Sequence, residues 1–158
     1  MSRRADRAGV VTVLTETPGA IKFALVDSGR APDPVLAAGE LRQGAATSAA
    51  GAIAGLMRPR PSKLLPRHFV IAATLEEVLF YRATGGATEG GGAYALRIAK
   101  DVVARFTRAE VQITDLDGGE RAKGGTLRVG DEAIPVVRAL LNGDPNTDEL
   151  LALLGADA

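Results

Sequence analysis

Short hydrophobic runs alternate with short polar segments along most of the chain. Hydrophobic residues recur at clear helical spacing near the two ends. Short apolar runs rich in β-branched residues, bounded by polar or glycine-containing turns, are typical of strands. The runs that predict strands are 35–41, 69–73, 78–82, 102–106, 111–116, 126–129 and 133–137. Because strand follows strand without a crossover helix, the pattern predicts an antiparallel sheet.

The first helical pattern lies in TETPGAIKFALVDSGR. Thr17 is a candidate N-cap, Pro18 suits the first helical position, and Gly29 is a plausible stop. The residues of the predicted inward face recur at helical spacing: Ile21, Ala24, Leu25 and Ser28. The segment 18–28 is therefore predicted to be a short amphipathic helix. The preceding run Val10–Leu14 fits either a strand or a hydrophobic tail.

The second helical pattern lies in DPNTDELLALLGADA at the C-terminus. Asn146 or Thr147 is the predicted N-cap, and the carboxylates of Asp148 and Glu149 suit the first turn. Gly155 is the predicted end of the helix. Its apolar side is formed by Leu150, Leu151, Leu153 and Leu154. The whole pattern predicts an α+β fold, mainly antiparallel β, in which a seven-strand meander is closed at one end by this helix.

Two hairpins are indicated by the connections between strands. In FVIAATLEEVLFYRA the polar segment Thr74–Glu77 joins two apolar runs, and farther on the turn Gly130-Asp131 joins two more, with Gly130 free to take a positive φ. A turn near 107–110 is expected between the strands on either side of it. The glycine-rich segment 83–93 is predicted to be a flexible loop.

The chain length and composition indicate one domain over residues 1–158. Hydrophobic residues make up 46% and charged residues 24%, which is ordinary globular usage. Residues 1–16 are predicted to be flexible or peripheral. Three prolines in MRPRPSKLLPRH exclude regular structure there, so 44–66 is predicted to be a long loop, with room for a short helix over 49–57.

Charge and cysteine usage exclude several classes of function. The 19 basic residues are balanced by 19 acidic ones, so the chain lacks the overall basic field of a general nucleic-acid binder. It has no cysteine, which excludes disulfides, thiol nucleophiles and cysteine-bound metals and fits a cytoplasmic location. The longest uncharged stretch, Gln43–Met57, is shorter than the about 20 strongly apolar residues that a membrane span needs.

Three short stretches carry a family likeness: Val70–Thr74, Val78–Phe80 and Ala104–Val111. In them the sequence resembles a group of short, mostly actinobacterial proteins of unassigned function that look like the bacterial pleckstrin-homology-like (PH-like) domains. The likeness covers roughly residues 20 to 138, with Ala73 where valine is usual and Thr107 where proline is usual. It implies a partly open barrel of two sheets and a helix that binds rather than catalyses, and it transfers no functional residue.

Candidate catalytic and metal-binding residues are few, and neither a cofactor nor a metal is expected. His68 is the single histidine, and a hydrolase-type enzyme using it is an alternative for which no nucleophile motif is present. Glu76 and Glu77 are adjacent in a turn, so they are predicted to be solvated rather than convergent. Asp115 and Asp117 lack the rest of a calcium-loop pattern, and the glycine-rich loop lacks the lysine of a phosphate-binding loop.

A basic cluster is the predicted binding site: Arg58, Arg60, Lys63 and Arg67. No acidic residue lies between Gln43 and Leu75, so the long loop could meet an anionic membrane surface or an acidic partner, or else be a solvated linker. We expect a small non-catalytic binding or assembly module that acts through this loop or through a sheet edge. A protein partner adding a strand and a homo-oligomer are both ways of covering such an edge.

Overall fold

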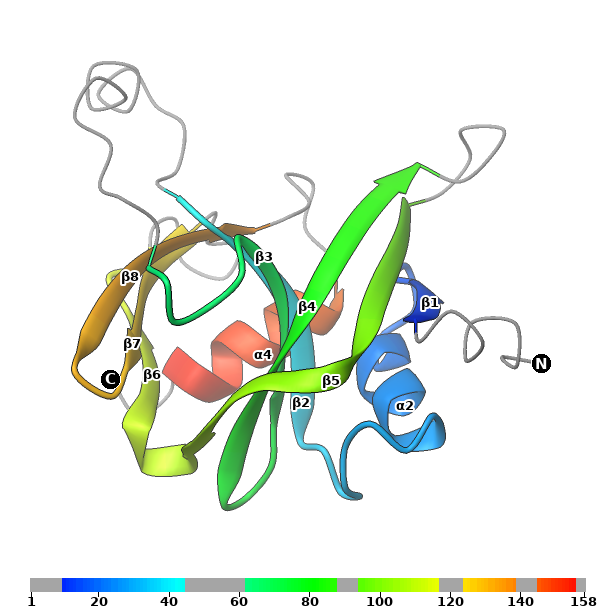
Figure 1. Ribbon diagram of the computed structural model, residues 1–158, viewed down its shortest axis with the longest axis horizontal. Coiled ribbons are helices and arrows are strands. Elements are labelled where there is room, and N and C mark those ends of the chain that lie inside the picture. Colours follow the sequence, from blue (N-terminus) through cyan, green and yellow to red (C-terminus); the bar gives the residue numbers. More distant parts are fainter. Residues whose placement is uncertain (1–9, 45–61, 88–93, 117–123, 139–144, 156–158) are drawn as a thin grey trace.

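An eight-stranded antiparallel sheet and two helices make up the described part of the chain in this computed structural model, which covers residues 10–44, 62–87, 94–116, 124–138 and 145–155 (Figure 1). The strands are β1 (Val10–Leu14), β2 (Ala37–Gln43), β3 (His68–Ala73), β4 (Glu77–Ala87), β5 (Tyr94–Thr107), β6 (Val111–Thr114), β7 (Gly124–Val129) and β8 (Glu132–Arg138). The helices are α2 (Ala20–Asp27), α4 (Pro145–Gly155) and the 3₁₀ turn η2 (Arg108–Glu110). The predicted α+β class is confirmed.

The order of the strands across the sheet is β1-β5-β4-β3-β2-β8-β7-β6. The hairpin series β2 to β5 and β6 to β8 follow the predicted meander, but β5 and β6 do not pair. Instead, β2 pairs with β8 and joins the two series, and β1 adds an eighth strand beside β5. The simple seven-strand meander was therefore wrong. The sheet curls into a partly open barrel, with α4 beside it (Figure 1).

The long hairpin of β4 and β5 bends where its pairing is irregular. Its register shifts between Phe80 and Tyr81 and again between Tyr81 and Ala83. Such bulges increase the local twist of a strand pair. The two halves of β5 consequently have different neighbours, because Ala95–Ala99 pairs with β1 whereas the half from Val102 to Thr107 pairs only with β4.

Apolar side chains form two cores on opposite faces of this sheet. The inner core lies inside the curl and includes Leu41, Phe69, Phe80, Ile113, Leu127 and Leu150. The outer core lies under β1 and α2 and includes Val11, Ile21, Leu25, Val70, Leu79 and Ile98. Alternate residues of β3 enter one core and then the other. This explains why its sequence, FVIAA, is apolar without interruption.

The predicted N-terminal helix exists, but its start differs from the prediction. The helix begins at Ala20, preceded by Gly19 with φ +79°, so Thr17 is not its side-chain cap. The carbonyl of Thr17 instead accepts a hydrogen bond from the Ala20 amide at 3.1 Å. Gly29, with φ +75°, follows the helix as predicted. The inward face is confirmed by two fully buried residues, Ile21 and Leu25.

The predicted C-terminal helix is confirmed, but neither predicted cap residue lies outside it. The helix begins at Pro145, so Asn146 and Thr147 lie within it, and both are buried. Asp148 lies in the first turn as expected. Leu150, Leu151 and Leu154 are buried, and Leu153 packs partly against the same core.

Both hairpins are confirmed: β3 pairs with β4 and β7 with β8, with Gly130 at φ +56° in the second turn. Of the predicted flexible loop 83–93, residues 83–87 are strand and pair with β5, so the prediction was wrong there because small residues still pair through their backbone. Residues 88–93 lie outside the described part. The strand after η2 ends at Thr114, before Asp115 with φ +56°.

The N-terminal run Val10–Leu14 is strand β1 rather than a hydrophobic tail. Residues 62–67 have no regular structure apart from bends, as predicted for the end of the long loop. The rest of that loop, 45–61, with the helix suggested over 49–57, and residues 1–9 lie outside the described part. Within the described residues, no helix has both the length and the apolar character needed to cross a bilayer.

Candidate functional site

Two of the four residues of the predicted basic site lie in the described part of the chain. Lys63 and Arg67 are both exposed, at the end of the long loop and next to β3. Arg58 and Arg60 lie outside the described residues. Whether the four residues form one surface therefore stays a prediction.

A single glutamine side chain fixes the described end of this loop. The Gln43 Nε2 amide donates to the carbonyls of Ser62, Leu65 and Pro66 at 3.1, 2.9 and 3.1 Å. Its Oε1 accepts from the Ser62 amide at 2.6 Å. The Ser62 hydroxyl in turn donates to Glu132 Oε1 at 2.6 Å, so a carboxylate lies close to this basic segment. These contacts give the loop end a defined conformation.

His68 contacts an acid that the sequence pattern did not single out. His68 Nε2 lies 2.7 Å from Glu40 Oε2, and their side chains are 13% and 0% exposed. Glu40 lies on β2 and His68 on β3, which places the acid inside the sheet. A charged residue in the small-residue strand AAGELRQ was the only local signal. A buried carboxylate needs such a partner, so the contact has a structural reason.

The His68–Glu40 pair does not by itself form a hydrolytic site. Nucleophilic catalysis needs a hydroxyl within reach of the imidazole. In the described part of the chain, Glu40 is the hydrogen-bond partner found for the His68 ring. Groups of three or more histidine or acidic side chains that could hold a metal ion are also absent from that part.

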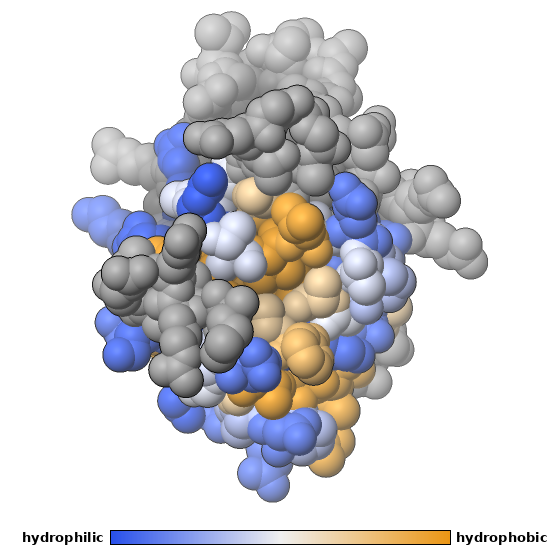
Figure 2. All heavy atoms as spheres, turned by 90° about the vertical axis from the view of Figure 1, so that its right-hand side faces the viewer, coloured by the Kyte–Doolittle hydropathy of each residue, from blue (hydrophilic) through white to orange (hydrophobic). Residues whose placement is uncertain are grey.

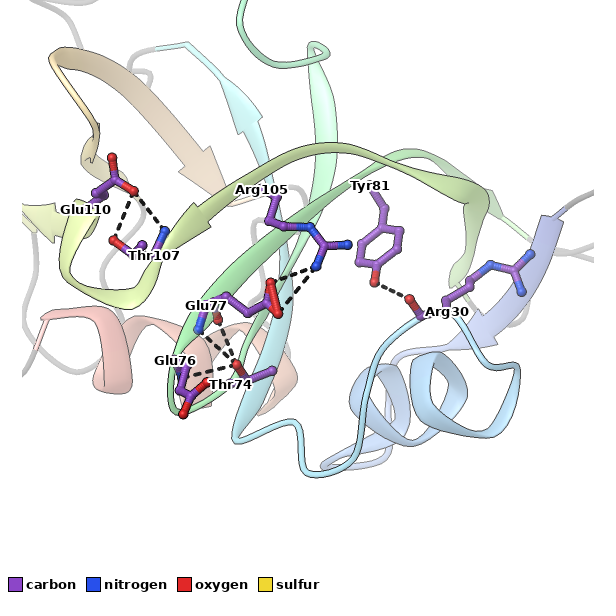
Figure 3. Close-up of polar contacts among 8 residues, drawn as sticks. All are labelled: Arg30, Thr74, Glu76, Glu77, Tyr81, Arg105, Thr107 and Glu110. Carbon is purple, nitrogen blue, oxygen red and sulfur yellow. Dashed lines mark hydrogen bonds and ion pairs between the residues drawn. The ribbon is translucent and has the colours of Figure 1, made fainter.

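The two acids of the β3–β4 turn have separate roles (Figure 3). The Thr74 hydroxyl accepts hydrogen bonds from the amides of Glu76 and Glu77 at 3.3 and 3.0 Å. The Glu77 carboxylate extends to Arg105 on β5, at 2.8 Å, whereas that of Glu76 points away from it. The two carboxylates therefore do not converge on a common ligand, as predicted for a turn.

A buried tyrosine ties β4 to the segment after α2 (Figure 3). The Tyr81 hydroxyl donates to the Arg30 carbonyl at 2.7 Å, and the residue is fully buried. Burial raises the pKa of Tyr81 to about 12, and the nearby charges of Arg105 and Arg30 only partly oppose this. The hydroxyl therefore stays protonated and acts as a structural donor rather than as a base.

A capping box holds the turn between β5 and β6. The Glu110 carboxylate accepts from the amide and the hydroxyl of Thr107, both at 2.9 Å (Figure 3). These two hydrogen bonds, the backbone one first, lower the pKa of Glu110. The turn is thus fixed locally, and it directs the chain from one edge region of the sheet to the other.

The end strand β1 carries an exposed apolar surface. Val11 and Val13 point into the outer core, so Val10, Thr12 and Leu14 form the opposite side of the strand. Leu14 is 52% exposed, and Phe23 on the neighbouring helix α2 is 70% exposed. Figure 2 shows the side of the molecule that bears β1 and α2, where apolar residues form a band between hydrophilic ones. We use the name β1–α2 face for the exposed surface of these two elements, with Val10, Thr12 and Leu14 on the side of β1 away from the outer core and Phe23 on the outside of α2.

The opposite end of the sheet is less accessible. Strand β6 has four residues, with Val111 and Ile113 buried and Gln112 and Thr114 half-buried. The end of α4 approaches it, since a Cβ on Gly155 would lie 3.8 Å from the Ile113 carbonyl oxygen. Of the two end strands in the described sheet, β1 is the one with a large exposed apolar side chain.

Comparison of the chain with protein-family models, with curated proteins and with solved structures found no match.

Proposed function

We propose that the protein is a small non-catalytic binding or assembly module that holds its partner on the β1–α2 face. The observation that carries the proposal is an uncharged end strand that exposes Leu14, next to a helix that exposes Phe23. Exposed apolar patches rimmed by polar residues are typical of interaction sites. A binding role is also what the resemblance to the PH-like domains implies.

The edge of β1 is chemically suited to accept a further strand. In the described sheet β1 pairs only with β5, so every second residue directs its amide and carbonyl away from the sheet. Proteins usually protect such edges with lysine, proline, a bulge or a covering segment. The sequence VVTVL contains no charge and no proline, and its pairing with β5 is regular. Strand addition there would satisfy backbone groups and cover apolar side chains together.

The double variant Leu14→Lys, Phe23→Glu tests this function. Both side chains are exposed, so we expect the fold to stay intact and binding through the β1–α2 face to be lost. The matched control is Leu75→Lys, because Leu75 is 71% exposed but lies in the turn between β3 and β4. Tagged wild-type, double-variant and control proteins are used for quantitative affinity capture, with mass spectrometry of what is retained.

The expected result is that at least one protein, including untagged copies of this chain, is retained by wild type and control but is reduced about tenfold or more with the double variant. Equal retention by all three proteins, or retention of nothing above background by wild type, would show that the β1–α2 face is not the binding site.

A further inference from the structure

Strand β1 is nearly palindromic, which matters for the identity of its partner. Around Thr12, the sequence VVTVL places valine on both sides at the next positions and an aliphatic residue on both sides beyond them. An interface between identical chains with two-fold symmetry needs a surface that is complementary to itself. We infer that the partner on the β1–α2 face is a second copy of this chain, paired antiparallel through β1. This inference rests on the proposed function.

The pairing around Thr12 brings like residues together on each side of the strand. Thr12 would face Thr12 of the second copy, a pair that is favourable across antiparallel strands. Val11 would face Val13 of the second copy on the side of the outer core, and Val10 would face Leu14 on the exposed side. Each exposed Leu14 therefore gains an aliphatic neighbour, and the two outer cores become continuous across the seam.

The charges near the seam do not oppose this arrangement. Strand β1 has none, and the residue paired with Thr12 on β5 is the exposed Arg97. In the paired sheet, the two Arg97 backbones are three strand spacings apart, about 14 Å. That separation exceeds the screening length of about 8 Å at physiological salt, so the repulsion between them is small.

Helix α2 supports strand β1 from the side of the outer core. It packs on the outer core together with Val11 and Val13, and its Phe23 points out of that core. The second copy accounts for the exposed Leu14, whereas the β6 end offers no comparable exposed side chain within the described residues.

The first measurement is sedimentation of the wild-type protein over a wide concentration range. We expect a reversible monomer–dimer equilibrium. Thr12→Lys places two like charges opposite each other and should raise the dimer dissociation constant at least about tenfold. Thr12→Glu should do the same, and an equimolar mixture of the two variants should form dimers again. The matched control is Thr114→Lys on the opposite end strand β6, which should leave the equilibrium unchanged.

A second measurement does not depend on the folding of charged variants. The chain has no cysteine, so Thr12→Cys provides its sole thiol. A short bismaleimide should link two copies of this variant, and it should link Thr114→Cys far less. A mixture of Val10→Cys and Leu14→Cys should give more linked product than either variant alone, because only unlike positions face each other.

A wild-type protein that stays monomeric at all concentrations, or equal cross-linking at Thr12 and Thr114, would overturn the inference. The wild type could instead be monomeric and retain a different protein that the Leu14→Lys, Phe23→Glu variant does not retain. In that case the proposed function holds and the second copy is rejected as the partner. If the wild type is monomeric and the capture finds nothing, both proposals fail.

Discussion

Single polar side chains inside this protein are used to hold backbone groups of distant segments. The Gln43 amide fixes the end of the long loop, the Tyr81 hydroxyl binds the Arg30 carbonyl, and the Asn146 amide donates to the carbonyls of Thr15 and Thr17. A buried backbone group without a partner costs about 1–3 kcal/mol, so each of these contacts stabilises its segment. The local sequence specifies none of these three contacts, and it marked Asn146 as a helix cap rather than as a partner of Thr15 and Thr17.

Tyr81 gives the protein a pH dependence at the alkaline end. Its pKa is raised from 10.0 to about 12, so between these values the unfolded chain has lost the phenolic proton and the folded chain keeps it. The contribution of Tyr81 to the free energy of unfolding is therefore fully present below about pH 10. It falls by about 1.4 kcal/mol per pH unit between about pH 10 and pH 12. Tyr81→Phe removes this dependence along with one hydrogen bond.

We expect the stability advantage of wild type over Tyr81→Phe to decrease by up to about 3 kcal/mol between about pH 9 and pH 12. Urea unfolding at several pH values measures it. Tyr94→Phe, which removes the other of the two tyrosines in the chain, should leave the dependence in place. A constant difference between wild type and Tyr81→Phe over this range would contradict the assignment.

At the scale of elements, helix α4 lies against the part of β2 where a neighbouring strand is missing. Strand β8 pairs with β2 only over Leu41–Gln43, which leaves the earlier part of β2 without that neighbour. There the Thr147 hydroxyl accepts from the Glu40 amide at 3.2 Å and donates to the Glu40 carbonyl at 3.4 Å. Gly39 makes this approach possible, because a Cβ there would lie 2.8 Å from the Thr147 Cα. The helix thus covers an edge that would otherwise be open.

Thr147→Val keeps the shape of the side chain and removes its hydroxyl. Both backbone groups of Glu40 then lose a buried partner, so we expect the free energy of unfolding to fall by about 1–3 kcal/mol. Thr147→Ser keeps the hydroxyl and is the matched control, with a smaller loss. Chemical denaturation measures both, and equal losses for valine and serine would show that the hydroxyl does not hold α4 against β2.

At the scale of the whole molecule, the two cores share one sheet. Leu25 on α2 is buried in the outer core and Leu150 on α4 in the inner core, yet both cores are completed by alternate residues of β3 and β4. Asn146 on α4 also accepts from the Ile21 amide at 3.1 Å, which links the two helices directly. Loss of one core should therefore weaken the other, because the strands between them are common to both.

We expect Leu25→Ala and Leu150→Ala each to lower the stability of one common unfolding transition by about 2–5 kcal/mol. Scanning calorimetry tests this, since a single domain gives one transition with equal calorimetric and van't Hoff enthalpies. A separate early transition in Leu25→Ala, with the remainder of the protein unchanged, would instead show that the β1–α2 part unfolds independently.

The sequence alone determined the local elements. Alternation and turn residues predicted the strands of both hairpins, and the leucine spacing predicted the buried side of α4, because these features depend on neighbours a few residues away. Only the tertiary structure decided the pairing of β2 with β8 and of β1 with β5, the contact of His68 with Glu40, and the use of Asn146 and Thr147 as tertiary partners instead of helix caps. Each of these joins residues far apart in the chain, so no local pattern specifies it. The exposed edge of β1 is likewise a property of the assembled sheet.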